Sequence, residues 1–129
     1  MQIIYLTLEQ VLLIHEDQIV RYGGSSGLRD VSLLESAIFR PQSSFGGEDL
    51  YLTIFDKASA LMHSLILNHS FIDGNKRTGT ASMLVFLELN EYRLHVSQKA
   101  LIEIALKIES KKINMEELAD WLKKNSKKY

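Results

Sequence analysis

Two apolar segments of helical length, separated by a short polar loop, constrain the fold of this 129-residue chain more than any other feature of its sequence. The first segment covers about residues 51–68, and its apolar positions recur at helical spacing. The second, TGTASMLVFLELN at residues 78–90, is apolar on nearly all sides. A helix of that kind is buried by neighbouring elements. We therefore predict two central helices that other helices cover, joined by the loop at residues 69–77.

Helix-capping residues divide the rest of the chain into further helices. Four polar residues that suit an N-cap each precede a run with apolar residues at helical spacing: Thr7, Asp30, Ser97 and Asn114. The first helix ends at the glycine pair at residues 23–24, and the second ends before Pro41. Residues 90–96 read as a turn with a short extended piece, and residues 123–129 as a solvated, frayed tail. We predict an all-α fold: one domain, residues 1–129, forming a compact bundle of about six helices with a short extended flap or loop.

Composition argues against several classes of protein. The formal net charge of −1 gives no basic face of the kind that duplex nucleic acid requires. The chain has no Cys, which excludes disulfides and thiolate metal sites. No segment approaches the roughly 20 apolar residues of a membrane span, and the first ten residues lack the pattern of a signal peptide. We expect a soluble, cytoplasmic protein that binds neither nucleic acid directly nor a membrane.

The loop between the central segments combines side chains that suit a phosphate and a metal ion. Asp73, Gly74, Asn75, Lys76 and Arg77 precede the second apolar helix, whose N-terminal N–H groups and dipole favour an anion. Gly74 can adopt the positive φ that lets successive amides form a concave nest. Lys76 and Arg77 add positive charge, and the guanidinium can bind two oxygens at once. Asp73 supplies the carboxylate that Mg²⁺ takes beside a polyphosphate.

A histidine completes the set. His69, at the end of the first apolar segment, could accept a proton near neutral pH. Phosphate site, metal ligand and general base together describe transfer of a phosphate-bearing group from a nucleotide to a hydroxyl. Each residue alone has an ordinary structural explanation, and we assign such a role to Phe71, as an apolar anchor for the loop. His15, on a helix face with apolar neighbours, and the GGSSG segment at residues 23–27, which lacks a nucleotide-loop pattern, receive no function.

The segment HSFIDGNKRTG, residues 69–79, resembles the signature of the Fic/Doc (Fido) superfamily, whose commoner form reads H-x-F-x-D/E-G-N-G-R-x-x-R. Lys76 replaces a Gly of that form, and Thr80 replaces its second Arg. These departures are the pattern of the Doc (death-on-curing) toxin branch, whose motif has the N-K-R-T run seen here at residues 75–78. The resemblance extends through RYGGSSGLRDVSLLESAIFRPQ, residues 21–42, and covers nearly the whole chain.

The resemblance implies a Fic/Doc fold and a role for each residue of the loop. His69 would be the base that deprotonates the target hydroxyl, and Asp73 would hold Mg²⁺. The phosphates of ATP would be cradled by four consecutive residues: Gly74, Asn75, Lys76 and Arg77.

The resemblance leaves two reactions open. Fic proteins usually transfer AMP from ATP, whereas Doc proteins are thought to bind ATP in the opposite sense and transfer its γ-phosphate. A Lys at 76 fills space that Gly leaves open and attracts the terminal phosphates, and without an Arg at 80 one clamp of the AMP-transfer pose is missing. We therefore favour a protein kinase. A Fic-type AMP-transferase is the alternative, and a non-enzymatic helical binding module is a more distant one.

The same resemblance implies partners. Doc toxins phosphorylate a Thr of elongation factor Tu, which halts translation, and an antitoxin with a disordered C-terminal segment restrains them. The segment SSFGGEDL at residues 43–50 matches in position the family's flap, which holds the target chain, although a mere connection explains it equally well. Ser44 to Glu48, followed by Asp49, is the nearest match to the inhibitory motif of Fic proteins, [S/T]-x-x-x-E-[G/N], and it fails at the last position.

Overall fold

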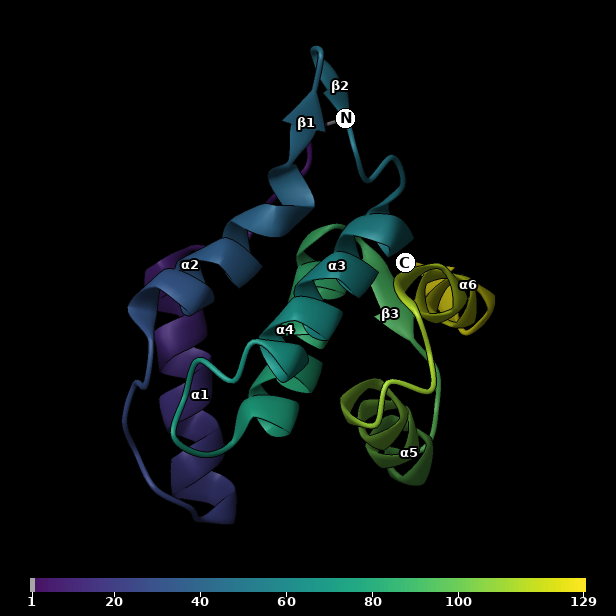
Figure 1. Cartoon of the computed structure of the whole chain (residues 1–129). Coiled ribbons are helices and arrows are strands. Elements are labelled where there is room, and N and C mark those ends of the chain that lie inside the picture. Colours follow the sequence, from purple (N-terminus) through teal and green to yellow (C-terminus); the bar gives the residue numbers. More distant parts are fainter. Residues whose placement is uncertain (1) are drawn as a thin grey trace.

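Six α-helices make up most of the computed structural model, which describes residues 2–129 (Figure 1). Their bounds are α1 Leu8–Tyr22, α2 Val31–Phe39, α3 Ile54–Leu67, α4 Asn75–Leu89, α5 Gln98–Glu109 and α6 Met115–Lys124. A 3-10 turn, η1 Arg40–Gln42, follows α2. The prediction of an all-α bundle of about six helices is confirmed. None of the helices within residues 2–129 has the length and apolar character needed to cross a membrane.

The two central helices are α3 and α4, as predicted. They lie side by side, with α1 and α2 on one flank and α5 and α6 on the other (Figure 1). Gly79 allows their close approach, because a Cβ at that position would lie 2.8 Å from Cγ1 of Ile66 and 3.3 Å from the carbonyl oxygen of Met62. The hydrophobic core is built around this contact, and Leu61 and Phe86 are each 1% exposed within it.

Side chains cap the helices where the sequence predicts, and two boundaries differ. Helix α3 begins after Thr53, three residues later than expected, because Thr53 and Asp56 form a capping box. Helix α4 begins at Asn75, so Lys76 and Arg77 lie within its first turn and do not precede it as expected. The reason is Gly74, whose φ of 79° turns the chain into the helix one residue ahead of Asn75.

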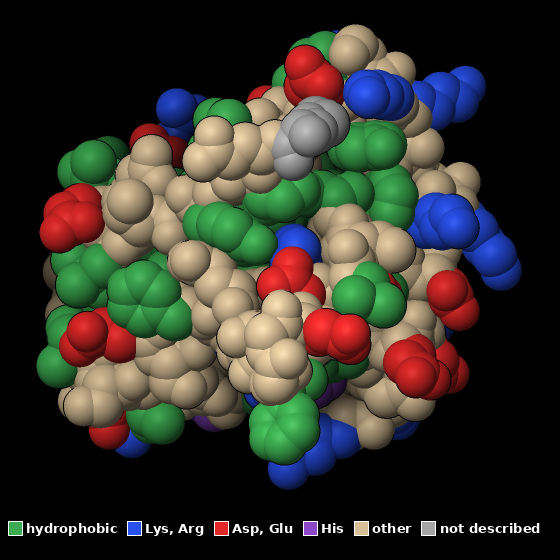
Figure 2. All heavy atoms as spheres, turned by 90° about the horizontal axis from the view of Figure 1, so that it is seen from above, with side chains coloured by type: hydrophobic (Ala, Val, Ile, Leu, Met, Phe, Trp, Pro, Cys, Tyr) green, Lys and Arg blue, Asp and Glu red, His purple; other side chains and the backbone are tan. Residues whose placement is uncertain are grey.

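A short antiparallel hairpin forms the predicted extended flap. Strands β1 (Ser44–Phe45) and β2 (Glu48–Asp49) pair across a turn made by Gly46 and Gly47, both with positive φ. The hairpin projects from one end of the molecule (Figure 1). Figure 2 looks down on that end and shows several separate groups of hydrophobic side chains at the surface among acidic ones. Phe45, at the tip, is 81% exposed.

The C-terminal residues do not form the frayed tail expected from the sequence. Strand β4 (Ser126–Lys128) pairs antiparallel with β3 (Tyr92–Leu94), the strand that follows α4. The Tyr129 hydroxyl also donates a hydrogen bond of 2.7 Å to the Glu88 carbonyl. The prediction was wrong because backbone pairing with a distant strand stabilises this segment, and its Lys-rich side chains carry no pattern that reports such pairing.

Candidate active site

The motif loop, residues 68–74, connects the end of α3 to the start of α4 and has a fixed shape. Phe71 is 3% exposed and stacks on the His15 ring, with centroids 3.7 Å apart and planes 6° from parallel. The Asn75 amide accepts a hydrogen bond of 3.0 Å from the Phe71 N–H and donates one of 2.9 Å to the Phe71 carbonyl. Phe71 is therefore the apolar anchor that the sequence indicated. The side-chain amide of Asn75 is used to close the loop, so the part of this residue left to meet a phosphate is its backbone N–H.

The segment after α1 lies along the loop and forms its second wall. The Ile72 N–H donates to the Gly27 carbonyl at 3.1 Å, and the Arg29 N–H donates to the Ser70 carbonyl at 2.7 Å. Leu28 and Phe71 form an isolated antiparallel bridge between the two segments. Sequence reasoning gave the segment GGSSG no role, and its contribution is structural support for the loop. Its three glycines were the available signal, since all of them have positive φ.

Backbone N–H groups hold the carboxylate of Asp73. The Ser25 N–H donates to Oδ2 at 3.1 Å, and the Gly74 N–H donates to Oδ1 at 2.8 Å. These two hydrogen bonds lower the pKa of Asp73, against a small opposing effect of burial, and the positive charge of Arg77 adds to the lowering. Gly24 must lack a side chain here, because a Cβ would lie 2.5 Å from Oδ2 of Asp73. Asp73 is therefore ionised and held in one orientation.

His15 and Arg77 connect the loop to α1. Nε2 of His15 lies 2.8 Å from the Asp73 carbonyl oxygen, and a carbonyl can only accept, so this nitrogen carries the proton. Arg77 donates through Nη2 to the Gly23 carbonyl at 2.9 Å, and its guanidinium carbon lies 5.9 Å from the centre of the Tyr22 ring. No function was expected for His15 from the sequence. The signal that it supports the site was its polar ring on an otherwise apolar helix face, since a buried ring N–H needs an acceptor.

The first turn of α4 presents free hydrogen-bond donors. Gly74 is the N-cap and has no side chain to cap the helix, and the first helical bond runs from the Thr78 N–H to the Gly74 carbonyl at 2.9 Å. The N–H groups of Asn75, Lys76 and Arg77 therefore donate to no other group within residues 2–129. Together with the positive end of the helix dipole, these three free N–H groups make the first turn of α4 suitable for binding an anion, and we call it the anion site.

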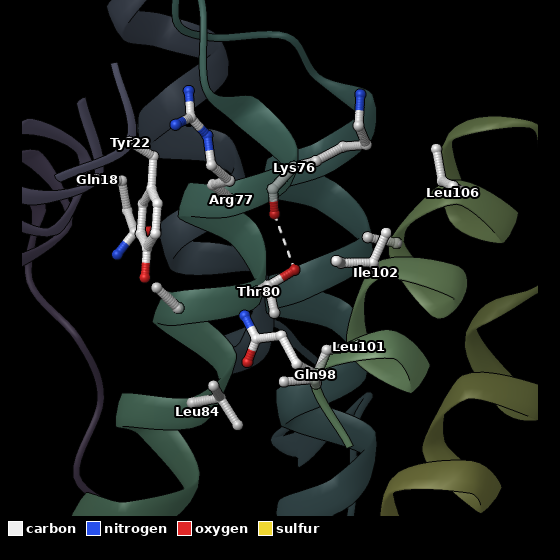
Figure 3. A pocket seen from close by; sticks show the side chains of 12 residues that line it. Gln18, Tyr22, Lys76, Arg77, Thr80, Leu84, Gln98, Leu101, Ile102 and Leu106 are labelled. Carbon is white, nitrogen blue, oxygen red and sulfur yellow. Dashed lines mark hydrogen bonds between the residues drawn. The ribbon is translucent and has the colours of Figure 1, made fainter. Parts of the chain in front are cut away.

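Lys76 and Arg77 leave the first turn of α4 in different directions (Figure 3). Lys76 turns toward α5, where its ammonium lies 2.9 Å from Oε2 of Glu109. A cleft of about 520 Å³ runs from these two residues along α4, between α1 and α5, and apolar side chains such as Leu84 and Ile102 line most of it (Figure 3). The structure thus brings Arg77 beside Asp73, but it pairs the ammonium of Lys76 with a carboxylate outside the loop.

His69 is exposed at the opposite end of the loop from α4. Helix α3 ends at Leu67 with Asn68 as its C-cap, and His69 follows with a φ of 49°, in the left-handed region. Neither ring nitrogen of His69 makes a hydrogen bond within the part of the chain that the structure describes. Both ring nitrogens are therefore open to a molecule bound from outside.

Asp73 can serve as a magnesium ligand with help from a substrate. Residues 2–129 contain no cluster of three or more His, Asp or Glu side chains that could hold a metal ion. Each carboxylate oxygen of Asp73 accepts one backbone N–H, which leaves a lone pair on each oxygen for a cation. Mg²⁺ is usually bound through one or two carboxylates, with phosphates and water as the other ligands. An ionised Asp73 beside an anion site fits that pattern.

Comparison with known proteins identifies a family that shares this sequence pattern. The sequence model described as the Fic/DOC family matches residues 5–87, a range that contains the motif loop and both segments supporting it. A protein named Toxin Doc from Mycolicibacterium smegmatis is 42% identical over 90 residues, which cover 70% of this chain and 67% of that protein. A protein named Protein kinase doc from Escherichia phage P1 is 28% identical over 120 residues, which cover 93% of this chain and 94% of that protein.

Proposed function

The chain belongs to the Fic/DOC family, and from that premise we propose that it is the toxin of a toxin–antitoxin pair, acting as a protein kinase. The reaction transfers the γ-phosphate of ATP to a Thr or Ser hydroxyl of a translation factor, with elongation factor Tu as the expected target. The observation that carries the proposal is the motif loop, which places an ionised Asp73 beside three free N–H groups and an exposed His69.

In the proposed reaction His69 is the general base. Its free ring nitrogen takes the proton of the target hydroxyl, whose oxygen then attacks the γ-phosphorus as the bond from that phosphorus to ADP breaks. The N–H groups of Asn75, Lys76 and Arg77 bind the phosphate oxygens. Asp73 holds Mg²⁺, which supplies charge neutralisation of the phosphates when it is bound.

Lys76 has to leave Glu109 to reach a terminal phosphate. Both side chains of this ion pair are more than one-third exposed, and exposed pairs contribute only about 0–1 kcal/mol to stability. Contact with a phosphate oxygen readily offsets a loss of that size. The ion pair therefore does not argue against a phosphate-binding role for Lys76.

An antitoxin is the proposed partner, and the cleft between α1, α4 and α5 suits its disordered C-terminal segment. The cleft is mostly apolar, as an amphipathic peptide that folds on binding requires. It ends at Lys76 and Arg77, so a segment bound there reaches the residues that meet ATP. We propose that residues 1–129 act as one Fic/Doc domain in the cytoplasm.

Parallel incubation of elongation factor Tu with α-labelled and γ-labelled ATP tests the proposed reaction. We expect the γ label on the target, and we expect His69→Ala to lower its incorporation by about 10²–10⁴-fold, the usual contribution of a general base. Incorporation of the α label would instead support the AMP-transferase. Incorporation of neither label into this target or into other proteins of a lysate would contradict both enzymatic proposals.

A further inference from the structure

The backbone of His69 needs external support. Its φ of 49° is uncommon for a residue with a side chain, and the residue lies on the surface just beyond the last turn of α3. The imidazole itself makes no hydrogen bond within residues 2–129 that could fix its position. The direction of the side chain therefore depends on what holds the peptide groups on either side of it.

One residue, Arg29, holds three consecutive carbonyl groups around His69. Its Nε donates to the His69 carbonyl at 2.6 Å, and its Nη2 donates to the Asn68 carbonyl at 3.2 Å. Its backbone N–H donates to the Ser70 carbonyl at 2.7 Å. On the other side, the Asn68 amide donates to the Leu33 carbonyl at 2.9 Å, which fixes the end of α3 from a second direction.

The chemistry of these contacts favours Arg over any other side chain. A guanidinium presents several N–H donors in a rigid fork, so it can hold two neighbouring carbonyls at once, whereas an ammonium is a point charge on a flexible stem. The carbonyls at the C-terminal end of α3 also carry the negative end of the helix dipole, which attracts a cation.

We propose that Arg29 is a positioning residue for the base: it fixes the peptide groups of residues 68–70 and thereby aims the His69 imidazole at the target hydroxyl. This inference rests on the proposed function. Arg29 does not touch the anion site. Its hydrogen bonds go to the carbonyls of residues 68–70, whereas the Asp73 carboxylate is held by the N–H groups of Ser25 and Gly74, and the first N–H groups of α4 are free. Arg29 also lies at the surface, so its two side-chain bonds contribute little to the stability of the fold.

Kinetics of Arg29→Met and Arg29→Lys test the proposal, with Arg93→Met as the matched control. Arg93, on β3, is also exposed, and its guanidinium lies over the ring of the C-terminal Tyr129, away from the loop. We expect Arg29→Met to lower kcat by about tenfold to a hundredfold, the range that a small misplacement of a catalytic group produces. The KM for ATP and the melting temperature should stay near those of the parent. Arg29→Lys should recover part of kcat, and Arg93→Met should leave it unchanged.

A second comparison separates positioning from a general structural effect. In a His69→Ala background, Arg29→Met should cause no further loss of the residual rate, since the base that it positions is absent. An equal loss in both backgrounds, or a rise in the KM for ATP with kcat unchanged, would overturn the proposal.

A spectroscopic readout keeps the inference separate from the enzymatic proposal. The ring resonances of His69, assigned in the parent by their loss in His69→Ala, should broaden or split in Arg29→Met as the imidazole samples several orientations. Unchanged His69 resonances in Arg29→Met would refute the positioning role whether or not the chain transfers phosphate. Altered resonances in a chain that labels no protein would support the positioning role and contradict the kinase alone.

Discussion

Lys57 is a buried cation beneath the flap, and the two residues of its ion pair should respond very differently to substitution. Its side chain is 2% exposed, and Nζ donates to Oδ2 of Asp49 at 3.1 Å and to the Pro41 carbonyl at 3.3 Å. The ammonium also lies 5.6 Å from the centre of the Tyr5 ring. Burial lowers the pKa of Lys57, but hydrogen bonds to Tyr5 and Asp49 outweigh burial and leave the pKa raised. Lys57 is therefore charged in the folded protein at neutral pH.

The asymmetry follows from the exposure of the two partners. Asp49 is 54% exposed, so Lys57→Met lets its carboxylate return to water while the Met side chain fills the space of the Lys stem. We expect Lys57→Met to change the free energy of unfolding by less than about 1 kcal/mol, because losing the pair is offset by removing a buried charge. Asp49→Asn removes the negative charge and leaves the buried ammonium with neutral acceptors only, the new amide oxygen and the Pro41 carbonyl, beside the Tyr5 ring. Its cost should be about 2–3 kcal/mol, below the roughly 3–5 kcal/mol for breaking a fully buried pair.

Urea denaturation of both single variants and the double variant measures these values. In the double variant, where Met replaces Lys57, Asp49→Asn should cause almost no further loss in the free energy of unfolding. Because the pKa of Lys57 is raised, the contribution of the pair should be present at neutral pH and lost as the pH rises above about 10.4 through the folded-state pKa. If Lys57→Met lowered the free energy of unfolding as much as Asp49→Asn does, the reasoning would be refuted. Both variants should raise the KM for the protein target and leave the KM for ATP unchanged, since only the flap loses its anchor.

Three further predictions concern the core, the pH dependence of stability and the cleft. Gly79→Ala should destabilise the fold by about 1–3 kcal/mol in the same urea assay, because the added methyl meets a buried Ile66 across the central helix pair. A gain in stability would mean that α3 and α4 can move apart at no cost. Burial, with the charge of Arg40 adding to it, lowers the pKa of His63, so the free energy of unfolding should fall as the pH drops below about 6.5. His63→Gln should make the free energy of unfolding less dependent on pH in this range, and an unchanged pH dependence would contradict the reasoning. Ile102 is 55% exposed in the cleft, and Ile102→Glu should weaken binding of the antitoxin's C-terminal peptide at least about tenfold, as measured by calorimetry, while leaving the kinase rate unaltered. Unweakened binding would mean that the peptide binds elsewhere.

The sequence was a good guide wherever neighbouring residues determine the structure. Thr7 and Gln10 form the capping box that their spacing predicts, and Gly74 adopts the positive φ expected of it. Phe71 is buried under the loop, as expected for an apolar residue among polar ones. The pattern of caps and apolar spacing also predicted the six helices, because these features act within one or two turns.

The supports of the candidate site could not be predicted in the same way. The bond from His15 to the loop joins residues 58 apart in sequence, and the bond from Arg29 to the His69 carbonyl joins residues 40 apart. Neither residue differs in type from many that have only local roles. The pairing of Ser126–Lys128 with β3 escaped prediction for the same reason, since which strand a short polar segment meets depends on the packing of the helices between them.

The dependence of the motif loop on α1 has a consequence during synthesis of the chain. The ribosome releases α1 and the segment after it first, and the loop and α4 follow about fifty residues later. Asp73 is held by Ser25, and the loop rests on His15, so the anion site cannot take shape until α4 has emerged and packed beside a completed α1. A chain that ends before α4 therefore lacks the anion site altogether, and the residues of the loop come together only after both α1 and the second central helix have been made.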